Sequence, residues 1–201
     1  ADPFGANNFG GAVNVAYLGA GINGGAHRVS NAVTLRSASF SGFSAAVQHS
    51  FGEVAGETSG STRTAYTLEY AQGPVKVNFT TARKNDATGN KSFENRQFVG
   101  SYKAPFATLF AGYQEAESAG AAADIESTYV GAIIPVNTNV NVLVNYTDVK
   151  NLGNASGRDA DAFAIGVTYA LSKRTTAYAM HGQSNNDTST SNLKVTSLGA
   201  G

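Results

Sequence analysis

Tight turns and long polar segments alternate along the chain, and this alternation strongly limits the folds that it can adopt. The tight turns fall at residues 41–42, 72–74, 104–105, 136–138 and 172–174. The long segments between them are rich in Gly, Ser, Asn and charge, at 52–62, 84–95, 117–124, 151–159 and from 185 onward. Segments of about ten residues, joined by short turns at one end and long loops at the other, are typical of a transmembrane β-barrel.

The segments between turns and loops have a two-residue period of polarity. Val75, Val77 and Phe79, for example, alternate with polar residues, which gives a strand one face for lipid and one for water. The same reasoning predicts about ten strands, at residues 31–40, 43–51, 63–71, 75–83, 96–103, 108–115, 125–134, 140–149, 162–171 and 175–183. We expect an all-β, antiparallel up-and-down barrel, with a soluble β-sandwich binding module as the alternative.

Composition narrows the function classes. The 201 residues contain no Cys, and 14 basic residues balance 14 acidic ones, which argues against a disulfide scaffold and against a nucleic-acid partner. No apolar run approaches the roughly 20 residues of a membrane helix, so a closed β-barrel is the remaining way to span a membrane. The chain opens in loop-like composition, and we expect it to be a mature or excised fragment.

Motifs for catalysis are weak. Residues 19–24 match G-x-G-x-x-G, but neither a helical period nor an acidic residue about 20 positions later follows them. His27, His49 and His181 are dispersed, and no metal-binding spacing is present. We therefore predict no enzyme, no catalytic residue, no cofactor and no metal. The alternatives are an outer-membrane β-barrel enzyme, which would need a Ser/His or Asp/His cluster at the loop-side rim, or an adhesin.

A family resemblance rests on seven short segments that occur in order along nearly the whole chain. They are Asp2–Gly5, Arg28–Leu35, Ser39–Ser44, Phe51–Glu53, Ala71–Val75, Leu109–Gln114 and Leu171–Thr175. Together they resemble the trimeric general porins of beta-proteobacteria. The resemblance implies a sixteen-stranded barrel of the Gram-negative outer membrane, of which this chain supplies about ten strands and therefore an incomplete barrel.

The resemblance also divides the chain. Residues 1–30 would be part of the inward-folded constriction loop, residues 31–183 a ten-stranded β-meander of the barrel wall, and residues 184–201 the truncated last external loop. It implies a water-filled channel for passive diffusion of small hydrophilic solutes and ions, with a preference for anions. The implied partners are two further copies in a homotrimer when the protein is full length, outer-membrane lipids and lipopolysaccharide.

Candidate pore residues come from the resemblance and from strand phase. The resemblance implies that Arg28 lies at the pore constriction. The polar phase of the strands makes Arg36, Lys76, Glu69, Asn78, Asn141 and Asn145 candidates for the pore lining. Fixed charge at such a wall would raise the local concentration of counter-ions.

Overall fold

The computed structural model describes residues 29–119, 124–151, 159–186 and 193–200. They form one antiparallel sheet in which each strand pairs with the next in sequence, from β1 to β11. The strands are β1 (Ala32–Arg36), β2 (Phe43–Ser50), β3 (Arg63–Gln72), β4 (Val75–Asn85), β5 (Lys91–Lys103), β6 (Thr108–Ser118), β7 (Ile125–Pro135), β8 (Val140–Asn151), β9 (Ala160–Ala170), β10 (Thr176–Asn186) and β11 (Leu193–Ala200). In this part of the chain, no helix is long and apolar enough to cross a membrane.

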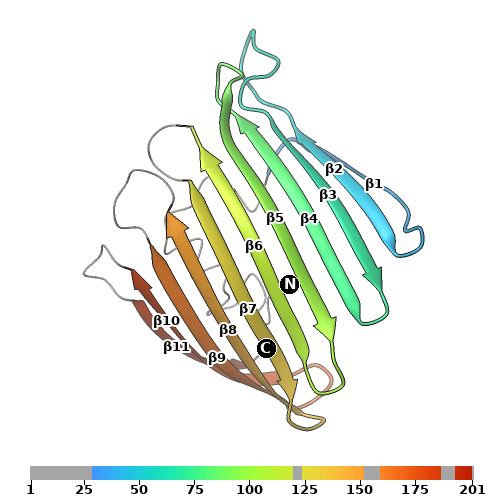
Figure 1. Ribbon diagram of the computed structural model, residues 1–201, viewed down its shortest axis with the longest axis vertical. Helices are drawn as coiled ribbons and strands as arrows, with labels where there is room; N and C mark the ends of the chain where they lie inside the picture. The colour runs from blue at the N-terminus through green and yellow to red at the C-terminus, as the bar shows by residue number, and fades with distance from the viewer. Residues whose placement is uncertain (1–28, 120–123, 152–158, 187–192, 201) are drawn as a thin grey trace.

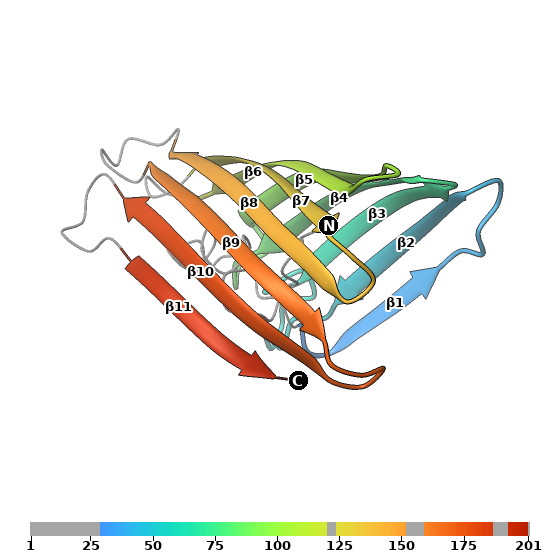
Figure 2. The same cartoon turned by 90° about the horizontal axis from the view of Figure 1, so that it is seen from below.

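The sheet is an open, curved wall. Figure 1 shows the tight turns at one end of the strands and the longer connections at the other. Figure 2, viewed from below, shows that the sheet is strongly curved, and its edge strands β1 and β11 are not paired with each other. The predicted up-and-down meander and the incomplete barrel are both confirmed.

Apolar side chains gather on the convex face. On β9, Phe163, Ile165 and Val167 are each at least 40% exposed, whereas the intervening Ala162 and Ala164 are buried. The register places these exposed residues beside Tyr146, Val144 and Val142 of β8. Strands β3 to β10 are 10 to 13 residues long, which meets the roughly 9–11 residues that a tilted strand needs to cross a bilayer. An exposed apolar face of this height is suited to hydrocarbon rather than to water.

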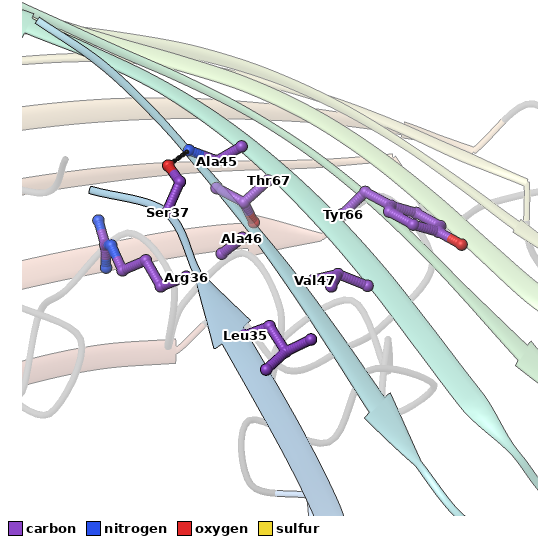
Figure 3. Close-up of a pocket in the computed structure, with 8 residues that line it drawn as sticks. All are labelled: Leu35, Arg36, Ser37, Ala45, Ala46, Val47, Tyr66 and Thr67. Carbon is purple, nitrogen blue, oxygen red and sulfur yellow. Dashed lines mark hydrogen bonds between the residues drawn. The ribbon is translucent and has the colours of Figure 1, made fainter. Parts of the chain in front are cut away.

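The first strand is shorter than the predicted 31–40, because a side chain takes over its hydrogen bonding. Ser37 donates its backbone N–H to the carbonyl of Ala45, and its Oγ accepts the N–H of the same residue at 2.9 Å. Figure 3 shows this second bond. The regular ladder therefore stops at Arg36, and Phe40 contributes only an isolated bridge to Phe43.

Two further expectations need correction. The predicted loop 84–95 is much shorter, because β5 begins at Lys91 and pairs with β4 across a β-bulge at Lys84/Asn85. The prediction that 184–201 is wholly a loop is wrong, since β10 continues to Asn186 and residues 193–200 form β11. Pairing with β10 from Ala177 to Ser184 satisfies the backbone of β11, and this pairing was not apparent in the weakly alternating sequence of β11.

Candidate functional site: the concave wall

Charge is divided unequally between the two faces of the described strands. The concave face of β1–β10 carries five cations and one carboxylate among these residues. The cations are Arg36, Arg63, Lys76, Lys84 and Lys103, and the carboxylate is Glu69. The loop-side part of the convex face carries six carboxylates, at Glu94, Glu115, Glu117, Glu126, Asp148 and Asp161, and four cations, at Arg83, Lys91, Arg96 and Lys150. A formal net charge of zero therefore hides a positive inner wall.

Four of the predicted pore-lining residues lie close together on β1, β3 and β4. Arg36 Nη2 is 3.2 Å from Glu69 Oε1, in an ion pair that is largely exposed. Glu69 is directly opposite Asn78 in the register, and Lys76 follows on the same face of β4. Because Arg36 neutralises Glu69, the charge that this group presents to the interior is that of Lys76.

The other two predicted residues lie on β8, away from this charged group. Asn141 donates from Nδ2 to Thr168 Oγ1 at 3.4 Å. Asn145 is 3% exposed and donates to Thr147 Oγ1 at 3.1 Å, while its Oδ1 has no hydrogen-bond partner among the described residues. Arg28 lies outside the residues that the structure describes.

Sequence reasoning missed three concave cations, Arg63, Lys84 and Lys103. Arg63 and Lys84 are direct cross-strand partners near the loop end of β3 and β4, and Lys103 ends β5. The two-residue period of the sequence predicts that all three lie on the same face as Lys76 and Glu69, so it could have identified them. Lys84 was missed because it was placed at the start of a loop.

Two external connections pack against each other at the loop end of β2–β5. Ser61 donates its N–H to the Asp86 carbonyl at 2.7 Å, and Asn85 donates from Nδ2 to the Ser59 carbonyl at 3.2 Å. Asp86 Oδ1 accepts the Thr88 hydroxyl at 2.8 Å and the Asn90 N–H at 2.9 Å. These bonds lower the pKa of Asp86, the Thr88 hydroxyl having the largest effect. This part of the loop end of the sheet is thus an ordered rim.

A hollow of about 520 Å³ lies against β1–β3 (Figure 3). Its lining is mostly apolar and includes Leu35, Val47 and Tyr66. Leu35 and Tyr66 are 66% and 58% exposed on the convex face, and in Figure 3 Tyr66 extends to the opposite side of the strands from Arg36. This hollow belongs to the lipid-facing surface rather than to the interior.

Histidines and carboxylates do not gather into a catalytic arrangement in the described ranges. His49 Nδ1 lies 2.8 Å from Thr64 Oγ1, and its ring packs edge-on against Phe51. No group of three His, Cys, Asp or Glu residues is placed to hold a metal ion within those ranges. The described strands thus combine a polar, positively charged concave face with an apolar convex face.

The class of protein that such a sheet defines is a membrane β-barrel. The family model described as Gram-negative porin matches residues 1–189, so the chain belongs to the Gram-negative porin family and to the bacterial outer membrane. No curated protein matches the chain in sequence.

Several solved structures share the fold. The anion-selective porin from Comamonas acidovorans superposes with a TM-score of 0.69 at 22% identity, covering 86% of this chain and 55% of that one. In vitro folded OmpT of Vibrio cholerae, described as a trimer form, gives 0.60 at 17% identity, with 84% and 61% covered. Salmonella typhi OmpF in complex with daunomycin gives 0.61 at 18% identity, with 76% and 53% covered. The chain thus spans a little more than half the length of these structures.

Proposed function

We propose that the protein is part of a general diffusion porin, a water-filled channel through which small hydrophilic solutes and ions pass down their gradients. The observation that carries this proposal is the division between the two faces of the sheet. Exposed apolar side chains such as Leu68 and Phe79 cover the convex side, while Lys76 and Asn78 alternate with them on the concave side. Water can fill a barrel with this lining, and lipid can surround it.

The channel prefers anions. Cations outnumber carboxylates by five to one on the concave face of the described strands, and the one carboxylate, Glu69, is already paired with Arg36. Fixed positive charge on a low-dielectric wall concentrates anions and repels cations. No covalent step is involved, so the protein acts without catalysis and without a cofactor.

Residues 1–30 complete the selective region as part of an inward-folded loop, with Arg28 at the constriction, and the strands β1 to β11 form the wall behind it. Arg36, Lys76, Glu69, Asn78, Asn141 and Asn145 line the pore. This assignment rests on the family resemblance and on the concave placement of the six lining residues.

The partners of the complete protein are two further copies in a homotrimer, together with outer-membrane lipids and lipopolysaccharide. A trimer form is described for the structurally similar OmpT of Vibrio cholerae. Lipid contact is supported by the exposed apolar belt, which ends at the loop side in aromatic residues such as Tyr113 and Tyr146. Aromatic rings at this level are typical of a membrane interface.

Conductance and reversal-potential measurements test the proposed channel and its selectivity. The complete porin, reconstituted in planar bilayers, should give stable ohmic conductance and a reversal potential of the sign for anion preference in a salt gradient. Arg28→Glu should move that potential toward cation preference, and the movement should be larger at low salt. A protein that inserts but does not conduct would overturn the proposed channel, and a cation-preferring wild type would overturn the proposed selectivity.

A further inference from the structure

A second hollow, of about 550 Å³, lies on the concave wall between β3 and β6. Glu69, Lys76, Asn78, Gln97, Ser101 and Phe110 line it. The strand register brings these side chains together, because Glu69 lies opposite Asn78, Lys76 opposite Ser101, and Ser101 opposite Phe110. Gln97 lies at the middle of β5 and the other five lie toward the tight-turn end of their strands, so the hollow is a feature of the barrel wall itself.

Lys76 supplies the charge of this hollow. Its two cross-strand neighbours, Ala71 and Ser101, are uncharged, and no carboxylate lies within 4.0 Å of its ammonium group among the described residues. The nearby carboxylate of Glu69 is bound to Arg36 at 3.2 Å. Arg36, Glu69 and Lys76 together leave one positive charge, which favours an anionic ligand.

Hydrogen-bond donors surround Lys76. The Thr80 hydroxyl donates to Asn78 Oδ1 at 2.9 Å, and Thr80 Oγ1 lies 3.1 Å from Thr67 Oγ1. Because Thr80 occupies the amide oxygen, the amide nitrogen of Asn78 is left as the donor toward the hollow. The Ser101 hydroxyl lies opposite Lys76. An ammonium, an amide N–H and a hydroxyl together suit the oxygens of a carboxylate.

Apolar surface lies beside these donors. Phe110 of β6 is half-buried, and Val99, which also lines the hollow, is 9% exposed. An inorganic ion cannot use this surface, whereas an organic acid can place its carbon skeleton against it while its carboxylate meets Lys76 and Asn78.

We propose that this hollow is a binding site for small organic carboxylates that carry an apolar body. Such solutes bind there transiently as they pass through the channel. The proposal rests on the proposed function and deepens it, since it names a solute class and its residues. Lys76 and Asn78 hold the carboxylate, and Phe110 with Val99 contacts the apolar body.

The experiment measures block of chloride current through the complete porin by three probes at fixed ionic strength. Benzoate has both the charge and the ring, acetate has the charge alone, and benzyl alcohol has the ring alone. Benzoate should block saturably at about tenfold lower concentration than acetate, and benzyl alcohol should not block, since both parts of the site are needed.

Three variants locate the site. Lys76→Gln should weaken benzoate block by about tenfold, the loss expected for one charge-assisted hydrogen bond. Phe110→Ala should bring benzoate to the level of acetate. Arg83→Gln is the matched control, because it removes one positive charge from the same strand but from its convex face and outside the hollow, and it should leave benzoate block within about twofold of the wild type.

The outcomes separate the two proposals. A porin that conducts, but in which benzoate and acetate block equally weakly, or in which Arg83→Gln matches Lys76→Gln, would overturn this site and leave the channel standing. A protein that inserts without conducting would overturn the proposed function, and this site with it. Should Lys76→Gln fail to fold, Asn78→Leu provides the second variant, and unchanged benzoate block in it would also count against the site.

Discussion

Gly112 on β6 shows how closely some neighbouring residues of the inner wall pack against each other. It lies opposite Tyr129 on β7, and a Cβ atom added to Gly112 would come within 2.1 Å of the Tyr129 ring. The ring crosses the wall at the place where the glycine has no side chain. We expect Gly112→Ala to displace the ring and to lower the free energy of unfolding by about 1–3 kcal/mol, measured by urea unfolding of the porin in lipid vesicles.

A second glycine provides the control for this substitution. A Cβ atom at Gly100 would meet nothing closer than the Lys76 carbonyl oxygen at 3.6 Å, which is ordinary contact. Gly100→Ala should therefore change the unfolding free energy little. Equal losses in the two variants would show that glycine matters here for backbone reasons and not because of Tyr129.

Asp86 makes the ordered rim at the loop end of β2–β5 sensitive to acid. Its pKa is lowered from the usual 3.8, first by the Thr88 hydroxyl and then by the Asn90 N–H. A lowered folded pKa means that the contribution to stability is complete above the unfolded value and is lost as pH falls through the folded value. We expect the protection of the Thr88 and Asn90 amides from hydrogen exchange to fall below about pH 4. In Asp86→Ala this protection should already be lost at neutral pH, and protection that persists in the variant would contradict this role.

At the scale of a strand, the two-residue period decides which substitutions the fold tolerates. Leu68 lies near the middle of β3 and is 51% exposed on the convex face, while its neighbour Thr67 faces the interior beside Thr80. Leu68→Lys should destabilise the folded porin by about 2–4 kcal/mol, the cost of a lysine near the bilayer midplane. Thr67→Lys should cost much less, because its ammonium reaches water. Vesicle unfolding measures both, and a similar cost at the two positions would exclude lipid contact at Leu68.

The strands that the sequence predicts well are those whose periodicity is strong. β4 and β9 were placed within a few residues, because large apolar residues alternate with polar residues in the first half of β4 and with small residues in β9. The start of β5 was missed, since Lys91 and Glu94 are charged, and charge was taken to indicate a loop. In the structure, Lys91 Nζ lies 3.0 Å from both Glu94 and Glu117 on the outer surface. Charged residues can thus continue a strand beyond the apolar belt.

Other features depend on pairing that a sequence does not display. β11 exists as a strand because β10 offers it a partner. The concave position of Arg36, Glu69, Lys76 and Asn78 follows from local phase and was expected, but the hollow that contains three of them needs the register of four strands at once. Local pattern gives the face of a residue, and only the assembled sheet gives its neighbours.

The whole molecule separates its charges, although their sum is zero. The outer surface near the loops holds mutually paired groups, such as Arg96 with Glu94 at 2.9 Å. The inner wall retains an excess of cations. Glu69 and Glu126 contribute equally to the net charge, but Glu69 lies on the inner wall and Glu126 on the outer surface. In the proposed channel, only Glu69 is therefore placed to repel passing anions.

This difference gives a test of selectivity that net charge alone would fail. Glu69→Gln and Glu126→Gln each raise the net charge by one. Glu69→Gln also releases Arg36 from its ion pair, so it should increase the anion preference of the reversal potential in a salt gradient, whereas Glu126→Gln should leave it unchanged. The Debye length falls from about 10 Å at 0.1 M salt to about 3 Å at 1 M, so most of the Glu69→Gln shift should vanish at high salt. If the two variants shifted the potential equally, the selectivity would arise from the total charge of the protein and not from its inner wall.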